Sequence, residues 1–298
     1  MTTAEPGIGP SPESGAAGGP TVLRMLLGAQ LRRLRESKGI TRETAGWEIR
    51  ASESKISRME LGRVSFKERD IVDLLTLYGV SDDAEREALL SLAREANAPN
   101  WWQRYTDVLP NWFQPFLGLE AAAELIRTYE VQFVPGLLQT RDYARAVLSL
   151  APDNPSGEDV DRRVAVRLGR QQILTRPDAP ALWAVVDEAV LRRPVGGTEA
   201  MRMQIEALIE ASKLPNVTVQ VIPFSAGGHS AAGGAFTILR FPDQGLPDVV
   251  YLEQITTALY LDKRDDVEAY AVAMSRLCVE AEPPARTVKI LEGILRDL

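Results

Sequence analysis

Residues 41–62 read TRETAGWEIRASESKISRMELG, and this stretch decides the fold of the N-terminal part of the chain. Its pattern predicts a short helix, a tight turn and a second helix that opens at Ser52. Ile56 and Met59 face inward at helical spacing in the second helix. A helix that reads the major groove needs this arrangement, because its first side chains reach base edges while its apolar face packs against the preceding helix. The stretch therefore predicts a helix-turn-helix.

Six side chains of this stretch are candidates for contact with double-stranded DNA. Glu53, Ser54 and Lys55 occupy the first turn of the second helix, which is the place for base contacts. The candidates for phosphate contact or helix orientation are Arg42, Ser52 and Arg58. Thr41 and Ser52 also stand where helix N-caps belong.

The distribution of charge supports this interpretation. The whole chain has a net charge of −7, whereas residues 21–64 contain ten basic and five acidic residues. A small basic module on an acidic chain predicts salt-sensitive DNA binding by one end of the molecule. The alternative is a set of solvated helix faces, on which opposite charges pair four residues apart.

Length and composition limit the remaining possibilities. With 298 residues, the chain is long enough for two domains. The single cysteine, Cys278, allows no intramolecular disulfide, and one cysteine with one histidine predicts no metal site. There is no phosphate-loop or dinucleotide fingerprint, so no cofactor is expected. The absence of a membrane-length apolar run or a signal-type N-terminus predicts a cytoplasmic protein that does not enter a membrane.

The sequence gives little support for an enzyme. GHSAAGG, which contains His229 and Ser230, is close to the G-x-S-x-G nucleophile elbow, but Ala232 replaces the second glycine. A strand-like run follows where the elbow needs a helix, and neighbouring serine and histidine side chains rarely form a catalytic pair. Acidic residues are plentiful without diagnostic spacing. We therefore expect no catalytic residues and no enzymatic activity.

The pattern divides the chain into four segments. Residues 1–20 are rich in Pro, Gly, Ser and Ala, and we expect a disordered tail. Residues 21–97 are expected to form an all-α helix-turn-helix domain of five helices. Residues 98–117 form a Trp-rich connector, and residues 118–298 form an α+β regulatory or interaction domain with a mainly antiparallel sheet.

The elements of the α+β domain follow from its periodicities. Helices are expected over residues 118–130, 140–149, 157–175, 198–213, 264–281 and 284–296. Strands are expected over residues 181–187, 217–222, 235–241 and 249–254. The last helix is either a packed terminal helix or a dimerisation or docking helix.

Several residues outside the helix-turn-helix are candidates for ligand or partner binding. Trp101, Trp102 and the nearby Trp112 predict burial between domains, with a ligand cage as the alternative. His229 lies in a glycine-rich loop that either closes over a ligand or is a plain hairpin.

A stripe of arginines forms a further candidate. Arg163, Arg167 and Arg170 share one helical face, which suits an anionic ligand or an acidic partner. The alternative is pairing with nearby acids such as Glu188 or Glu253.

The N-terminal pattern resembles a known family. The segments LGAQLRRLRESKGI (27–40) and ERDIVDLLTLYGV (68–80) flank the helix-turn-helix stretch, and together they resemble the XRE (Cro/C1-type) domain. Arg50 stands at the turn position that this family usually gives to glycine. Glu60-Leu61-Gly62 stands where the family often has Glu-Asn-Gly, so a contact made by that Asn is absent here.

The rest of the chain resembles bacterial regulators in which an XRE domain precedes a domain of unknown function, described as antitoxin-like transcriptional regulators. The matching segments are NWWQRYTDVLP (100–110), LEAAAELIRTYEVQFVPGLLQTRDYARAVL (119–148), RRVAVRLGRQQIL (162–174), VDEAVLRRPVGG (186–197), NVTVQVIPFSAGGHSAAGGAFTILRFP (216–242) and VVYLEQ (249–254). The resemblance implies a DNA-binding homodimer with a small partner protein encoded by a neighbouring gene.

These observations predict a sequence-specific transcriptional regulator that reads an inverted-repeat operator as a dimer. The C-terminal domain would dimerise and receive a signal from a partner protein or a small-molecule ligand. The alternative is an antitoxin-like interaction module that sequesters, or is regulated by, a small partner, with DNA binding for autoregulation.

Overall fold

The computed structural model describes residues 20–298 except 154, 232 and 243–245. The tail predicted over residues 1–20 therefore lies, apart from Pro20, outside the described residues. The chain splits into two compact units, Met1–Arg104 and Tyr105–Leu298, and the division falls inside the segment predicted as a Trp-rich connector.

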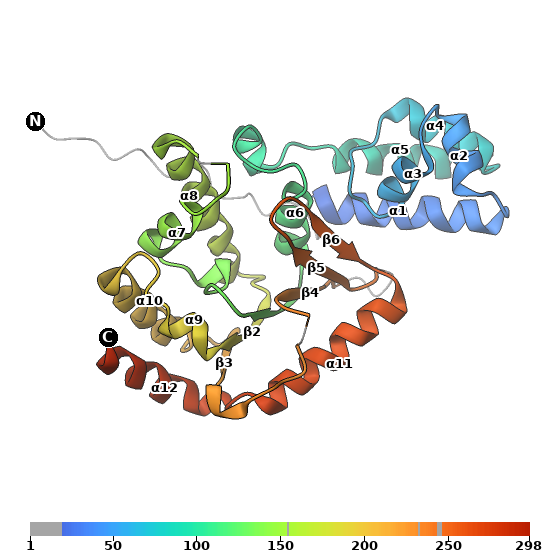
Figure 1. Ribbon diagram of the computed structural model, residues 1–298. Coiled ribbons are helices and arrows are strands. Elements are labelled where there is room, and N and C mark those ends of the chain that lie inside the picture. The colour runs from blue at the N-terminus through green and yellow to red at the C-terminus, as the bar shows by residue number, and fades with distance from the viewer. Residues whose placement is uncertain (1–19, 154, 232, 243–245) are drawn as a thin grey trace, which may run out of the picture. The chain divides into compact units, whose positions relative to one another are not determined.

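Five α-helices make up the described part of the first unit (Figure 1). They are α1 (Pro20–Ser37), α2 (Arg42–Glu48), α3 (Glu53–Glu60), α4 (Glu68–Leu77) and α5 (Asp83–Ala96), and a 3-10 helix, Trp101–Tyr105, follows. Their shared core includes Leu27, Leu31, Ile56, Met59 and Tyr78, each no more than 1% exposed. Leu27 and Leu31 of α1, which lie about one helical turn apart, thus meet Ile56 and Met59 of α3, whose inward orientation the spacing predicts.

A six-stranded mixed sheet forms the centre of the second unit, with strand order β3-β2-β1-β4-β5-β6. The strands are β1 (Leu125–Glu130), β2 (Ala181–Asp187), β3 (Val217–Ile222), β4 (Phe236–Arg240), β5 (Val249–Glu253) and β6 (Ala258–Leu261). β1 pairs with β2, and β2 with β3, in parallel; the pairings β1–β4, β4–β5 and β5–β6 are antiparallel. The predicted α+β class is confirmed.

Helices cover this sheet. They are α6 (Gln114–Ala122), α7 (Arg141–Leu148), α8 (Gly157–Gln171), α9 (Glu188–Arg192), α10 (Thr198–Ala211), α11 (Arg264–Glu280) and α12 (Pro284–Asp297), with 3-10 turns at Gly136–Leu138, Gln172–Leu174 and Phe224–Ala226. α11 packs along β3, β4 and β5, and α12 packs on β3 and α10 (Figure 1). No helix in the described part of the chain is long and apolar enough to cross a membrane.

One element was predicted wrongly. The helix expected over residues 118–130 ends at Ala122, and Leu125–Glu130 is strand β1, which lies inside the sheet between β2 and β4. Ile126, Thr128 and Tyr129 are buried there. This segment forms a strand because it pairs with two strands that are distant in sequence. The local sequence pattern, which looks helical, does not contain that information. The short elements β6 and α9 were also missed.

Candidate nucleic-acid interface

The N-caps predicted for the helix-turn-helix are present. Thr41 Oγ1 accepts a hydrogen bond from the Thr44 N–H at 3.1 Å, and Ser52 Oγ accepts one from the Lys55 N–H at 3.2 Å. Each bond satisfies a backbone donor that the first turn of a helix leaves without an internal partner. These two side chains fix where α2 and α3 begin.

The turn between α2 and α3 depends on a left-handed residue. Arg50 has φ +53°, and it is the one non-glycine residue with positive φ among those that the structure describes. The turn is closed by a hydrogen bond from the Ala51 N–H to the Gly46 carbonyl at 2.8 Å. The turn geometry usual for glycine is therefore retained by arginine, at a cost of about 1–2 kcal/mol in backbone strain.

Two glycines allow the helices of this unit to approach closely. A Cβ on Gly46 would lie 2.7 Å from the Ala51 carbonyl oxygen, and a Cβ on Gly28 would lie 2.5 Å from the Met59 carbonyl oxygen. Both contacts involve backbone atoms, which cannot swing aside as a side chain can. Gly28 thus lets α1 lie directly against the end of α3.

A buried carboxylate fixes α3 to the two helices before it. Glu60, which is 4% exposed, accepts hydrogen bonds from Arg35 Nε and Nη2 on α1 and from Arg42 Nε on α2, the last at 3.0 Å. The hydrogen bond to Glu60 raises the pKa of Arg35. We call Arg35, Arg42 and Glu60 the Glu60 clamp. It holds the orientation of α3, on which any DNA contact depends.

The structure gathers four of the six candidate side chains in one place. Arg42, Glu53, Ser54 and Arg58 line a shallow surface depression together with Ser57. Ser57 was not predicted, although it lies one helical turn after Glu53 and so shares its face. This depression is built from the exposed sides of α2 and α3.

The remaining two candidates have structural bonds. Ser52 is exposed and caps α3 with its hydroxyl. The Lys55 ammonium lies 2.7 Å from Asp70 Oδ2 on α4, and its side chain is 30% exposed. The ion pair directs Lys55 toward the neighbouring helix, so its side chain acts as a bridge between α3 and α4.

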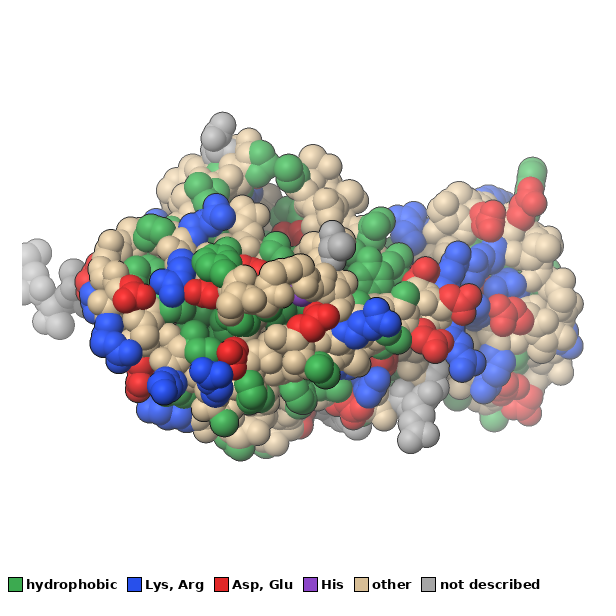
Figure 2. Space-filling model, turned by 60° about the horizontal axis from the view of Figure 1, so that its bottom comes forward, with side chains coloured by type: hydrophobic (Ala, Val, Ile, Leu, Met, Phe, Trp, Pro, Cys, Tyr) green, Lys and Arg blue, Asp and Glu red, His purple; other side chains and the backbone are tan. Residues whose placement is uncertain are grey.

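The basic charges of this unit are only partly neutralised. Figure 2 shows Lys and Arg side chains gathered over part of the first unit, interspersed with acids. Within residues 21–64, Arg32–Glu36 is the one ion pair of four-residue spacing that the described residues show. Arg50 and Arg58 are exposed and form no ion pair within the described part of the chain. Ion pairs between residues four apart on one helix therefore neutralise few of the basic side chains in residues 21–64.

Sequence reasoning also missed an exposed tryptophan. Trp47 on α2 is 79% exposed, beside the turn that Arg50 forms. The exposure of Trp47 could have been inferred from helical spacing. Ala45, Gly46 and Ile49 are the buried positions of this helix region, and Trp47 lies on the other side of the helix. A large apolar side chain on that surface is available for contact with a partner molecule.

The three arginines predicted to share a face lie on α8, and two of them hold carboxylates. Arg163 pairs with Asp153. Arg170 donates Nε and Nη2 to Glu120 at 2.7 and 2.6 Å in a buried pair. The acids predicted from sequence, Glu188 and Glu253, are not the partners of these two arginines. Glu188 pairs instead with Arg192, and Glu253 accepts a hydrogen bond from the Tyr251 hydroxyl.

Arg167 lies between the other two in sequence and differs from both. Its Nη1 donates to Gln139 Oε1 at 2.9 Å, and it forms no ion pair in the part of the chain that the structure describes. Burial lowers its pKa to about 10. Nearby, burial raises the pKa of Glu130 to about 8, and the negative charge of Glu253 adds to that effect.

His229 lies against the ends of the parallel strands. Its Nε2 is 3.0 Å from the Tyr129 hydroxyl and 3.8 Å from Asp187 Oδ2, and its Nδ1 accepts from the Ala231 N–H at 3.3 Å. The hydroxyl of Ser230 donates to Glu280 at 2.7 Å. The neighbouring serine is thus bound to a carboxylate and not to the histidine.

The predicted tryptophan cluster is divided between the two units. Trp101 and Trp102 lie in the first unit, where their rings meet edge to face at a centroid distance of 5.7 Å. Trp112 lies in the second unit and contacts Phe113 edge to face. Trp102 is buried, whereas Trp101 and Trp112 are half-buried.

Each unit matches a protein family. Residues 26–89 match the family described as Helix-turn-helix domain, and residues 113–293 match the one described as Domain of unknown function (DUF5753). No curated protein and no solved structure matches the chain. The first match confirms the predicted helix-turn-helix and indicates a DNA-binding regulator, and the second spans more than half of the chain. The chain therefore belongs to the DUF5753 family and carries a helix-turn-helix domain before that domain.

Proposed function

We propose that this protein is a sequence-specific transcriptional regulator that reads an inverted-repeat operator as a homodimer. The observation that carries the proposal is the depression on α2 and α3. There Arg42 of α2 lies beside Ser54, Ser57 and Arg58 of α3, the helix that the Glu60 clamp holds. Exposed polar side chains at the start of a rigid helix are the requirement for reading the major groove. The second unit would dimerise and receive a signal from a partner protein or a small molecule.

Within this proposal the side chains of the depression have different roles. Glu53, Ser54 and Ser57 are exposed or half-exposed on α3 and would reach base edges. Arg58 would bind phosphate, since no carboxylate in the described chain neutralises it. Arg42 donates a hydrogen bond from its Nε to Glu60, and its remaining N–H groups would contact phosphate. Lys55 would support α3 through Asp70.

The proposal assigns no reaction and no cofactor to either unit. Under this proposal the protein is located in the cytoplasm, where it binds DNA. The alternative is that the chain is an antitoxin-like interaction module whose second unit binds a small partner protein. Arg167 is a candidate contact for an acidic group of that partner.

The test is recovery of genomic fragments by the purified protein, followed by sequencing, at two salt concentrations. A few sharp peaks that share an inverted repeat are expected. Ser54→Ala should relax the preference at one base position, by about 1–3 kcal/mol for a lost base contact. Arg58→Ala should weaken binding to all sequences and lower the salt slope by about one.

Arg69→Ala is the matched control, because Arg69 is an exposed arginine on α4, outside the depression. It should bind DNA more nearly like the wild type than Arg58→Ala does. Diffuse recovery that higher salt abolishes would overturn sequence-specific binding. If Arg58→Ala and Arg69→Ala weaken DNA binding equally, the depression is not part of the DNA interface.

A further inference from the structure

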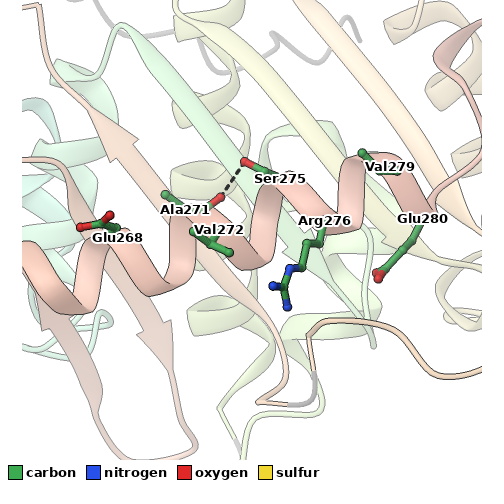
Figure 3. Close-up of a pocket in the computed structure, with 7 residues that line it drawn as sticks. All are labelled: Glu268, Ala271, Val272, Ser275, Arg276, Val279 and Glu280. Atoms are coloured by element: carbon green, nitrogen blue, oxygen red, sulfur yellow. Dashed lines mark hydrogen bonds between the residues drawn. The ribbon is translucent and has the colours of Figure 1, made fainter.

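Helix α11 buries one side against the sheet and leaves the other side uncovered. Met274 and Leu277 lie fully buried in the core beneath it. On the opposite side Val272 is 47% exposed and Val279 is 84% exposed. Between them runs a shallow, mostly apolar groove lined entirely by side chains of α11, which Figure 3 shows with Glu268 toward one end and Arg276 and Glu280 toward the other.

The charges along this face follow a regular order. Arg264, Glu268, Val272, Arg276 and Glu280 succeed one another at four-residue steps, which form one ridge of an α-helix. The order is basic, acidic, apolar, basic, acidic. Read backwards, it becomes acidic, basic, apolar, acidic, basic. The ridge is therefore complementary to its own reversed copy.

The charged residues nearest the centre are available for such a contact. Glu268 and Arg276 are both exposed, and neither forms an ion pair within the described part of the chain. Glu280 is less free, because its carboxylate accepts hydrogen bonds from the Ser230 backbone N–H and hydroxyl. Glu268 and Arg276 must then carry the specificity of the face.

We propose that this face of α11 is the surface through which two copies of the chain associate. A two-fold axis passing beside Val272 would set the two valines against each other and place Glu268 of each copy opposite Arg276 of the other. Such a contact is isologous, as most homodimer interfaces are. A parallel arrangement would instead oppose like charges, so the face selects the antiparallel copy.

This inference rests on the proposed homodimer and names its interface. A single pair of crossing helices is small for a protein interface, so the association is expected to be of moderate strength. Four-residue ridges from both helices interdigitate at a crossing angle of about −50°. The two symmetric ion pairs would set register and orientation more than affinity.

Charge reversal supplies the test, with association measured by sedimentation equilibrium of the full chain. Glu268→Arg alone opposes two arginines twice, and Arg276→Glu alone opposes two glutamates twice. Each single variant should weaken self-association by about tenfold or more, since both Glu268–Arg276 attractions become repulsions. The double variant, Glu268→Arg with Arg276→Glu, should restore it. A mixture of the two single variants should form a heterodimer, because their faces are then complementary.

The matched control is Glu292→Arg, an exposed acid on α12, which should self-associate like the wild type. All three positions are on the surface, and circular dichroism checks that every variant is folded. A wild type that is monomeric at all concentrations overturns the inference. So does a dimer that both single reversals leave unchanged, or a mixture that fails to associate.

DNA selection by the wild type is measured separately, by fluorescence anisotropy with operator and random duplexes. If the wild type dimerises through α11 without selecting DNA, the interface stands and the proposed function fails. If it selects DNA and the reversals leave its dimer intact, the proposed function stands and this interface fails.

Discussion

Removal of the Glu60 carboxylate should destabilise the helix-turn-helix more than any other change to its polar groups. Glu60→Ala leaves the Arg35 guanidinium, which is 7% exposed, in the protein interior without the carboxylate that now accepts two of its N–H groups. Breaking a buried pair by deleting one partner costs about 3–5 kcal/mol when the remaining charge is uncompensated. Arg35 keeps the exposed Glu36 and the Ile40 carbonyl as partners, so the lower end of that range is expected. Arg42 loses its contact with α3 at the same time.

The matched control uses a second acid on the same arginine. Glu36 lies 3.3 Å from Arg35 Nη2, but its side chain is 52% exposed. Glu36→Ala removes two solvated ion pairs, one with Arg35 and one with Arg32, and each such pair contributes about 0–1 kcal/mol. The same guanidinium therefore reports on a buried partner and on an exposed one.

The assay must resolve the first unit from the second, since a two-unit chain has no single free energy of unfolding. Native-state hydrogen exchange provides this resolution, because amides of α1 and α3 report the local free energy of opening. Glu60→Ala should lower that free energy by several kcal/mol, while amides of β1 and β2 keep theirs. A loss equal to that of Glu36→Ala would show that the clamp does not hold the unit together.

Three further changes test other parts of the structure. Arg50→Gly should stabilise the first unit by about 0.5–1 kcal/mol, since it relieves the left-handed strain at φ +53° but gives the unfolded chain more freedom; Arg50→Val should destabilise it, and thermal melts compare the two. Gly28→Ala should cost about 1–3 kcal/mol, because its Cβ would lie 2.5 Å from the Met59 carbonyl oxygen; Gly157→Ala, where a Cβ meets nothing within 4 Å, is the control and should be neutral or stabilising in urea unfolding. Glu130→Gln should flatten the pH dependence of stability in the second unit. Burial raises the folded pKa of Glu130 to about 8, above its ordinary value, so the folded state keeps a proton that the unfolded state releases. Its contribution is present at acidic pH and is lost as pH rises toward 8, with a slope of up to about 1.4 kcal/mol per pH unit. The free energy of unfolding is measured by urea titration of wild type and variant at several pH values. If it depends on pH equally in both proteins, this assignment is wrong.

The first unit could be predicted from sequence because its signals are local. Thr41 and Ser52 cap helices within three residues of themselves, and Ile56 and Met59 show their burial by spacing alone. β1 could not be predicted in this way. Its six residues become a strand because β2, more than fifty residues later, and β4, more than a hundred residues later, pair with it on either side.

The charges of the candidate site also depend on contacts that the local sequence does not show. Arg42 and Lys55 are basic residues of the helix-turn-helix stretch, and the sequence offers no reason to rank them below Arg58. The fold ranks them, because Glu60 binds Arg42 and Asp70 binds Lys55, whereas Arg58 keeps its charge exposed to solvent. A count of basic residues therefore overstates the charge that the module can offer to DNA. If these ion pairs persist in the complex, the salt slope of binding must be smaller than ten basic residues would give. A measured slope near that of full neutralisation would mean that DNA competes successfully with Glu60 and Asp70, and that the clamp opens on binding.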